Sequence, residues 1–291
     1  METLFRWSKY VEEDRLEEWE SRLIMADITY SAEKQVNRKR WQLSTYTTTR
    51  DEADELRARF GGGVTEMRPG DWQPSAEAGA ESRLKIRDSL LVTEAGDDAV
   101  WESLKVEFPD RIVMSFPPQM AFGTGGHPTT AGCLRFLADT AATRKGKPWR
   151  VLDLGCGSGI LAIAAALLGA AEVYAVEIDE MALSYAVRNA ERHGVADKIS
   201  FSTDDAIEVL DEQRFGAFDV IAANLFSELL MRILPSCQGS LNSGGEVIVS
   251  GFLTSQAGDV SRCAEESGLP FDDYLRRGKW VAAMARTEKK D

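Results

Sequence analysis

The segment from Arg150 to Asp179 constrains the fold of this chain more than any other stretch of it. It opens with an apolar run, Val151 to Leu154, which is typical of a strand buried on both faces. Three glycines at alternate positions follow. They let the backbone turn tightly and approach a ligand closely, because no Cβ stands in the way. The Ala- and Leu-rich stretch from Ile160 to Leu168 then predicts a helix.

An acid at the end of the next strand indicates the kind of ligand. Val173 to Val176 predict a second strand, and Glu177 lies at its carboxyl end. Doubly wound sheets bind ligands at this edge, where an acid can accept hydrogen bonds from both ribose hydroxyls. The helix that begins after the glycines points its N-terminal amides toward the same place. The segment therefore predicts a ribose-bearing cofactor over the edge of a parallel sheet.

The glycine spacing distinguishes two classes of cofactor. A dinucleotide fingerprint is G-x-G-x-x-G, whereas Gly155, Gly157 and Gly159 alternate here and Ile160 occupies the sixth place. With Asp153 ahead of them the pattern is D-x-G-x-G-x-G, which resembles the S-adenosylmethionine (SAM) site of class I methyltransferases. The plainer alternative is a turn that only packs closely. The flanking strand and helix and the downstream acid disfavour that alternative.

Composition sets broader limits. The 291 residues, 44% of them hydrophobic, predict a soluble globular chain of one large or two ordinary domains. A net charge of −13 would repel a phosphate backbone, so we expect no direct nucleic-acid recognition. Four cysteines without C-x-x-C or metal-ligand spacing predict a reduced, cytoplasmic protein with no metal site. The N-terminus lacks a signal-peptide core, and no apolar run is long enough to span a membrane. The oligomeric state stays open.

Residues 1–67 differ in texture from the rest and predict a small domain. A strand near Leu4–Trp7, a helix carrying Leu16, Trp19 and Leu23, and extended stretches at Ile28–Tyr30 and Trp41–Thr47 come first; a helix from Asp51, a plausible N-cap, to Phe60 follows. This βαββα pattern is compatible with a ferredoxin-like α+β module. The cluster Arg38–Trp41 is interpreted as covering a sheet edge rather than binding RNA.

Residues 68–110 are interpreted as a linker and connecting elements, and residues 111–291 as the cofactor-binding domain. Pro, Gly, Ala and Ser dominate residues 68–82. Strands at Leu84–Thr93 and Arg111–Phe116 flank a helix near Asp98–Phe108, without a firm assignment to either domain. From Thr129 onward strands and helices alternate, as a parallel sheet requires. The strands Tyr274–Arg276 and Trp280–Ala285 predict a terminal antiparallel hairpin.

Two polar positions outside the glycine turn are candidates for chemistry. The loop from Met120 to Cys133 can close over a cofactor, with Thr129 and Thr130 as hydroxyl donors, although Pro128 and the threonines also suit a simple helix start beside His127. Asn224 ends the strand Phe218–Ala223, where its amide oxygen can accept a hydrogen bond from a substrate amine. Its alternative role is an N-cap for a helix over residues 225–234.

The acids that follow the third strand of the predicted sheet are a weaker candidate. Asp204 and Asp205 can meet an adenine amino group, or they can cap a helix.

Taken together, AFGTGGHPTT, VLDLGCGSGILAIAAALLGA, VEID and AANL resemble the PrmA-type ribosomal protein methyltransferase family, whose members modify the large-subunit protein called L-eleven. The resemblance is strong over residues 118–251 and weak before Arg111. It implies a class I methyltransferase fold: a Rossmann-like doubly wound α/β sheet with a terminal antiparallel hairpin, preceded by a small α+β domain that holds the ribosomal protein. It implies SAM contacts from Thr130, Gly155, Glu177 and Asn224, and Gly157 belongs to the same turn.

Three positions depart from the family pattern. Gly126 stands in place of a threonine, Glu177 in place of the more frequent aspartate, and Leu225-Phe226 in place of an Ile-Leu pair, which affects the substrate pocket. The resulting expectation is SAM-dependent N-methylation of lysine or N-terminal amines of a large-subunit ribosomal protein. Asn224 orients the amine, and no residue is assigned as a general base. The alternatives are another protein lysine or a small molecule as substrate, a binding module without catalysis, and, more distantly, a nicotinamide dehydrogenase.

Overall fold

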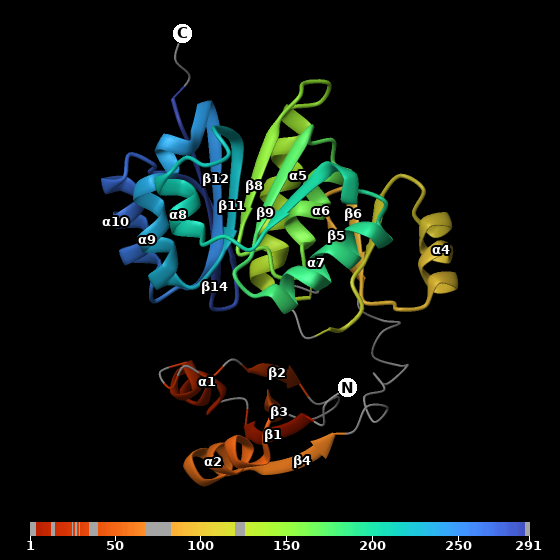
Figure 1. The fold of residues 1–291 in the computed structure, drawn as a ribbon, viewed down its shortest axis with the longest axis vertical. Coiled ribbons are helices and arrows are strands. Elements are labelled where there is room, and N and C mark those ends of the chain that lie inside the picture. Colours follow the sequence, from red (N-terminus) through yellow and green to blue (C-terminus); the bar gives the residue numbers. More distant parts are fainter. Residues whose placement is uncertain are drawn as a thin grey trace. The chain divides into compact units, whose positions relative to one another are not determined.

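The computed structural model describes residues 4–12, 15–24, 26, 28, 30–34, 40–67, 83–119 and 126–288. The chain divides into two compact units, residues 1–74 and residues 75–291. Figure 1 shows the elements of each unit. The predicted linker at residues 68–82, the predicted closing loop at residues 120–125, and Arg38 and Lys39 lie outside the described residues.

The first unit is a four-stranded antiparallel sheet with two helices. Its sheet has the order β2-β3-β1-β4, and its elements follow one another as βαββαβ, which is the order of the split βαβ motif. The last strand extends the βαββα pattern predicted from the sequence. The elements are β1 (Leu4–Glu12), α1 (Leu16–Ile24), β2 (Ser31–Lys34), β3 (Arg40–Thr47), α2 (Arg50–Phe60) and β4 (Gly63–Met67).

Aromatic side chains form the core of this unit. Trp7 is fully buried and packs edge-on against Phe60, and its indole nitrogen donates a hydrogen bond to the Gly61 carbonyl oxygen at 2.7 Å. Trp19 of α1 is buried in the same cluster, with the cations of Lys9 and Arg22 over its ring. Side chains alternate between the two faces along β1, so Trp7 and Val11 point to the same face of the sheet. The helices pack on this face and leave the other one uncovered.

Two boundaries predicted in this unit are wrong. The N-cap of α2 is Thr49, not Asp51: the Thr49 hydroxyl accepts from the Glu52 amide while the Glu52 carboxylate accepts from the Thr49 amide. This capping box places the start of the helix before Asp51. The extended stretch expected at Ile28–Tyr30 precedes the observed strand β2, and Ile28 instead bonds through its amide to the Leu23 carbonyl after α1.

The second unit contains a seven-stranded sheet of order β10-β9-β8-β11-β12-β14-β13. Five neighbouring strands are parallel, and β13 and β14 form the antiparallel hairpin predicted for the end of the chain. These elements are α5 (Pro128–Thr143), β8 (Arg150–Leu154), α6 (Ile160–Leu167), β9 (Glu172–Val176), α7 (Glu180–Arg192), β10 (Ile199–Ser202), α8 (Ala206–Asp211), β11 (Phe218–Asn224), α9 (Ser227–Cys237), β12 (Leu241–Leu253), α10 (Ala257–Glu266), β13 (Phe271–Arg277) and β14 (Trp280–Arg286).

Helices cover both faces of this sheet, which explains its apolar strands. Val151 packs into the cluster formed with α5, α6 and α7, whereas its neighbour Leu152 packs into the cluster formed with α8, α9 and α10. Val220 and Ile221 of β11 divide in the same way. Figure 1 shows the two helical layers on opposite sides of the strands. The doubly wound α/β class predicted from the sequence is therefore confirmed.

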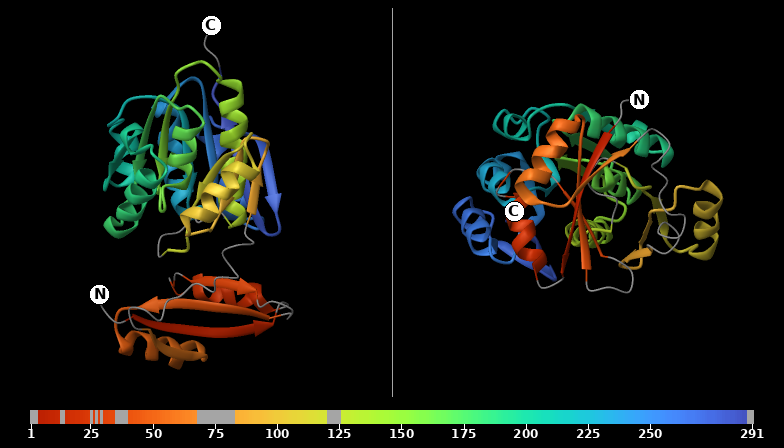
Figure 2. Two further views of the ribbon diagram at one scale, coloured as in Figure 1. Left: turned by 90° about the vertical axis from the view of Figure 1, so that its right-hand side faces the viewer. Right: turned by 90° about the horizontal axis from the view of Figure 1, so that it is seen from below.

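A small extension joins the second unit ahead of α5. It comprises β5 (Arg83–Ile86), β6 (Leu90–Thr93), α4 (Asp98–Glu107) and β7 (Ile112–Ser115), with the three strands in the order β5-β6-β7. Ile86, Met114 and Phe116 share the core cluster of α5, so residues 83–116 belong with the cofactor-binding fold rather than with a linker. Helix α4 lies at the outer edge of the unit in Figure 1 and in the right-hand view of Figure 2.

His193 connects this extension to the end of α7. His193 follows α7, and its Nε2 accepts a hydrogen bond from the Ser115 amide of β7 at 3.0 Å while Nδ1 lies 2.6 Å from the Asn189 carbonyl oxygen. The ring stacks on Phe116. Burial lowers the pKa of His193 to about 4, so the imidazole is neutral at pH 7 and can accept the Ser115 hydrogen bond.

Candidate active site

The predicted site residues lie where the strand order reverses. β8 and β11 are neighbours in the centre of the sheet; β9 and β10, which follow β8 in the chain, extend to one side, and β12, which follows β11, lies on the other. Sheets of this kind bind ligands at such a switch point, at the carboxyl ends of the parallel strands. Gly155 follows β8, and Asn224 ends β11 at this edge.

The glycine turn adopts a conformation that other residues enter at a cost. Gly155, Gly157 and Gly159 have φ angles of 66°, 53° and 78°, all in the left-handed region. A Cβ on Gly155 would meet the Leu225 Cδ2 at 2.4 Å, so the side chain after Asn224 lies directly on the turn. Gly159 similarly faces Ala186 of α7, with 3.0 Å left for a Cβ contact. The turn is held closely between two elements that come later in the chain.

Leu225 also fixes the end of β11 from the other side. A Cβ on Gly251 of β12 would meet the Leu225 carbonyl oxygen at 2.2 Å, and the Leu225 amide donates to the Ser250 carbonyl oxygen at 2.9 Å. Leu225 therefore lies between the cofactor turn and β12. This role of Leu225 was not predicted from the sequence, in which its only signal was an apolar residue directly after a strand-ending asparagine.

Glu177 is hydrogen-bonded to the glycine turn. Its Oε2 accepts from the Gly157 amide at 2.9 Å, and its Oε1 accepts from the Asp179 amide at 3.1 Å. Each carboxylate oxygen keeps a further lone pair for a ligand hydroxyl. The carboxylate is thus fixed in place by backbone donors at the carboxyl end of β9, the position predicted for it from the sequence.

Asn224 and Thr130 come together although they are far apart in the sequence. The Asn224 Nδ2 donates to the Thr130 Oγ1 at 3.4 Å, and Thr130 is fully buried. The Asn224 Oδ1 is buried without a hydrogen-bond partner among the described residues. Its alternative role as a helix cap is excluded, because α9 begins at Ser227 and its N-cap is Phe226. A buried acceptor without a donor is costly, so this oxygen is available for a donor from outside the described residues.

Helix α5 begins at Pro128, as the simpler interpretation of the threonine loop proposed. His127 is its N-cap and accepts from the Thr129 amide. Burial lowers the pKa of His127 to about 4, which keeps the ring neutral for this bond, and the ring packs edge-on against Trp280. The start of α5 is therefore a capped helix N-terminus, and it also places Thr130 next to Asn224.

Asp153 is buried beneath the turn, with 1% of its surface exposed. Its Oδ2 accepts from the Ala162 amide of α6 at 3.0 Å. Burial raises the pKa of Asp153 to about 7, with a smaller contribution from the charge of Glu177. The Asp153 carboxyl group beneath the glycine turn is therefore only partly ionised near pH 7.

The expectation that Asp204 or Asp205 meets adenine finds no support in the contacts. Asp204 is held by Ser202 and Arg214, and Asp205 is the N-cap of α8, accepting from the Ile207 amide at 2.7 Å. Large apolar side chains are instead exposed beside the site: Ile178 follows Glu177 with 69% exposure, and Phe226 follows Leu225 with 72% exposure. These exposed side chains could have been predicted from the sequence as apolar residues in loops next to candidate site residues.

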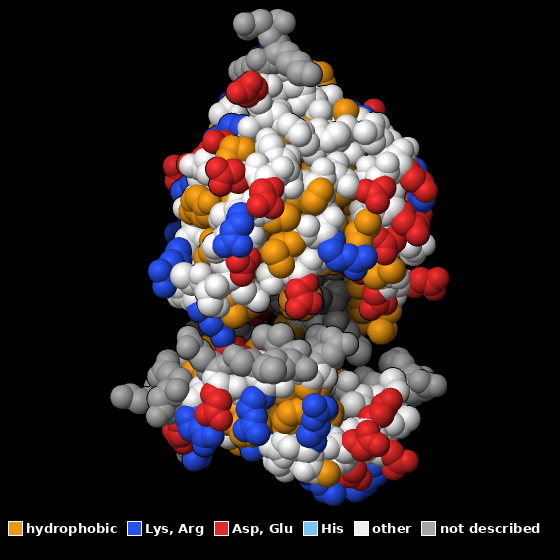
Figure 3. Space-filling model, turned by 90° about the vertical axis from the view of Figure 1, so that its left-hand side faces the viewer, with side chains coloured by type: hydrophobic (Ala, Val, Ile, Leu, Met, Phe, Trp, Pro, Cys, Tyr) orange, Lys and Arg blue, Asp and Glu red, His pale blue; other side chains and the backbone are white. Residues whose placement is uncertain are grey.

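Charges elsewhere on the second unit are mixed rather than gathered. On the face over α9 and α10, acidic and basic side chains are interspersed with single hydrophobic ones (Figure 3). No group of His, Cys, Asp and Glu able to hold a metal ion is found among the described residues. All four cysteines are free. None of the described helices has the length and apolar composition needed to cross a bilayer.

The sheet order, the alternating glycines and the acid ending β9 define a class I SAM-dependent methyltransferase fold. A family model described as ribosomal protein L11 methyltransferase (PrmA) matches residues 7–288, so the chain belongs to this family. The match covers nearly the whole chain, including the first unit, where the motifs quoted above are absent. The resemblance inferred from four motifs is confirmed.

Individual relatives agree with this assignment. The ribosomal protein L11 methyltransferase of Methylococcus capsulatus is 36% identical over 237 residues, which is 80% of this chain and 77% of that protein. The corresponding protein of Pelotomaculum thermopropionicum is 40% identical, but the match spans only 58% of its length. The crystal structure of a ribosomal protein L11 methylase from Lactobacillus delbrueckii is 31% identical with a TM-score of 0.58, covering 72% of this chain and 99% of that one.

Proposed function

We propose that this protein transfers methyl groups from SAM to amines, either lysine side chains or an N-terminus, of ribosomal protein L11. The orphaned Oδ1 of Asn224, at the switch point beside the glycine turn, carries the proposal. A buried acceptor at this edge suits an amine donor, and the family supplies the identity of the cofactor and of the protein substrate.

The chain's own residues fit the cofactor. We propose that Glu177 accepts the ribose hydroxyls while keeping its two backbone donors, and that Gly155 and Gly157 allow the backbone to approach the ligand without a Cβ. Thr130 and Asn224 close the site from α5 and β11. When bound, SAM supplies an electrophilic methyl group, so no nucleophilic side chain is required of the protein.

The residues around the site then orient the substrate and exclude water. Asn224 accepts a hydrogen bond from the incoming amine and so directs the nitrogen lone pair toward the methyl group. Alignment of this kind lowers the activation barrier by on the order of 7–11 kcal/mol. A lysine with an ordinary pKa of about 10.4 must first lose a proton. Desolvation in the site favours the neutral amine. Asn224 is not a base, and we assign none.

We further propose that the protein acts in the cytoplasm and that its first unit binds the ribosomal protein. The sheet face that its helices leave uncovered presents Tyr10 and Tyr46, which are 52% and 40% exposed. Exposed tyrosines on a rigid sheet supply contact area at low entropic cost.

The test is incubation of the purified full chain with isotopically labelled SAM and separated ribosomal proteins, followed by mass spectrometry. Label on amines of L11 alone is expected. Label on a different protein or on small metabolites would favour the alternative of another methyl acceptor. Calorimetry with SAM tests the cofactor separately: absence of binding would favour a module without catalysis.

A further inference from the structure

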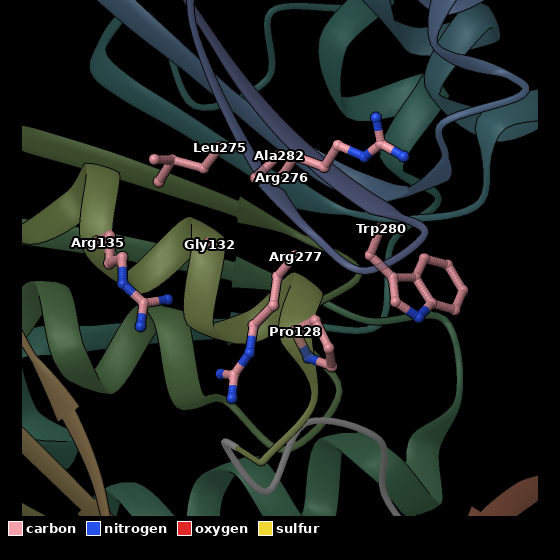
Figure 4. A pocket seen from close by; sticks show the side chains of 8 residues that line it. All are labelled: Pro128, Gly132, Arg135, Leu275, Arg276, Arg277, Trp280 and Ala282. Atoms are coloured by element: carbon pink, nitrogen blue, oxygen red, sulfur yellow. The ribbon is translucent and has the colours of Figure 1, made fainter.

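A pocket lies between the first half of α5 and the β13–β14 hairpin. We call it the α5 pocket; Figure 4 shows the side chains that line it, which include Pro128, Arg135, Leu275, Arg277 and Trp280. Its volume is about 220 Å³. Because pockets for drug-sized ligands measure about 300–1,000 Å³, this one suits a single side chain rather than a nucleotide.

Two arginines converge on this pocket without a counter-charge. In Figure 4 the guanidinium groups of Arg135 and Arg277 extend to the same side. Neither forms an ion pair within the described part of the chain, and Arg135 bonds only to the Ala131 carbonyl oxygen, at 3.0 Å. The acid one turn along α5, Asp139, is held through both oxygens by Arg87. Burial and the nearby cations Arg277 and Arg87 lower the pKa of Arg135.

The pocket also has an apolar wall. Leu275 packs against the core cluster of α5, and Trp280 stands edge-on to His127 at the helix start. The helix approaches the hairpin closely here, since a Cβ on Gly132 would meet the Ala282 Cβ at 2.6 Å. A carboxylate on a short apolar stem matches this combination of guanidinium groups and hydrophobic wall.

The position of the pocket links it to the reaction. Trp280 pairs with Leu253 at the end of β12, so the hairpin reaches the same edge of the sheet as Asn224. The first turn of α5 lines both places: Pro128 borders the pocket, and Thr130 contacts Asn224. One helix, about 10 Å across, separates them.

We propose that the α5 pocket binds an acidic side chain of the protein substrate and so sets which amine enters the active site, an inference that rests on the proposed methyl transfer. An extended chain advances about 3.3 Å per residue, so the acid lies about three residues from the modified one. A nucleic acid is the less suitable occupant. It needs a continuous cationic track, whereas the net charge of this chain is −13.

The binding test uses the full chain and a fluorescein-labelled octapeptide of alternating Glu and Leu, measured by fluorescence anisotropy. The Gln-for-Glu peptide and polyuridylate are the comparison ligands. We expect the acidic peptide to bind about tenfold more tightly than the Gln peptide. Equal binding of the two peptides, or binding of polyuridylate alone, would overturn the proposal.

Charge-reversal variants test the two arginines against a matched control. Arg277→Glu and Arg135→Glu are expected to weaken binding of the acidic peptide about tenfold or more. Arg232→Glu is the control, since Arg232 is exposed on α9 and bears the same charge, but it does not line the pocket. Its affinity should stay within about twofold. An equal loss in Arg232→Glu would show only a general effect of net charge and would contradict the proposal.

The kinetic test separates this proposal from the proposed function. With the unmethylated ribosomal protein as substrate, Arg277→Glu should raise KM about tenfold while leaving kcat and the Kd for SAM unchanged. Wild-type SAM binding and methyl transfer test the proposed function by themselves. If the wild type methylates its substrate and KM does not change in Arg277→Glu, the docking role fails and the methyltransferase assignment stands.

Discussion

The two units of this protein are stabilised in different ways. The core of the first consists of a few large side chains, such as Trp7, Trp19 and Phe60, whereas the active-site edge of the second depends on contacts too close for any side chain beyond glycine. Apolar residues of similar volume can replace one another in a core of the first kind. A Cβ at Gly155 or Gly251 would strike Leu225 at 2.4 or 2.2 Å, so these positions tolerate no such exchange.

This difference explains why the sequence motifs are concentrated in the second unit. A site that needs close backbone approach fixes particular residues at particular spacings, while a packed sheet and helix pair fixes only a pattern of polarity. The first unit accordingly shows little recognisable sequence, although the family model extends back to residue 7. Variants in each unit can test whether stability and chemistry are divided in this way.

The largest expected effect is in the first unit. Trp7→Ala should destabilise that unit by about 3–5 kcal/mol, because a fully buried indole is lost and the Gly61 carbonyl loses its donor. The Kd for SAM, measured by calorimetry, should not change, since every proposed cofactor contact lies in the second unit. Methylation of the ribosomal protein should fall. Weakened SAM binding would show that the two units are not independent in this respect.

The next effect is on turnover. Asn224→Ala is expected to lower kcat about 10²- to 10³-fold, by analogy with removal of one preorganised hydrogen-bonding group from an active site. Thermal stability should be kept or slightly raised, because the variant removes a buried acceptor that has no partner. Asn224→Asp, which keeps the shape of the side chain, is the matched control. Wild-type turnover in Asn224→Ala would remove this residue from the site.

The third effect depends on pH and comes from Asp153. Its pKa is about 7 in the folded protein and about 3.8 unfolded, so the folded state binds the extra proton and the contribution to stability is lost as pH rises from about 4 through 7. Asp153→Asn retains an oxygen for the Ala162 amide and has no charge to bury. It should stabilise the folded state at pH 8 by about 3–4 kcal/mol and so raise the melting temperature there, and it should leave the melting temperature unchanged at pH 4.

Measurement of melting curves for both proteins between pH 4 and pH 8 checks this prediction. His193 and His127 act in the opposite direction in both proteins, because their lowered pKa values reduce stability as pH falls from about 6.5 toward 4. Their effect cancels in the difference between variant and wild type. A difference that is independent of pH would contradict the assigned pKa of Asp153.

The smallest expected effect concerns the ribose acceptor. Glu177→Ala should weaken SAM binding about 10- to 100-fold with little change in kcat, since it removes hydrogen bonds made equally in the ground and transition states. Glu177→Gln can still accept from the Gly157 amide and should lose less. Equal losses in the two variants would indicate that the charge of Glu177, rather than its hydrogen bonds, is what the cofactor requires. Unchanged affinity in Glu177→Ala would refute the ribose assignment.

Local pattern was sufficient for much of the fold. Alternating glycines, apolar strands and the terminal hairpin predicted the doubly wound sheet, because each of these signals depends on residues close together in the chain. The local pattern gave the wrong residue where more than one neighbouring residue could start a helix. Thr49 rather than Asp51 caps α2, because a reciprocal bond with Glu52 was available, and Phe226 rather than Asn224 precedes α9.

The sequence by itself determined the class of the protein and the position of its glycine turn, since the backbone conformations and close contacts there admit few other residues. Only the tertiary structure decided which distant side chains meet. It brought Thr130 to Asn224, laid Leu225 on Gly155, and placed Arg135 beside Arg277 at one pocket. Such pairings depend on strand order and helix packing, which join segments that no local pattern in the chain connects.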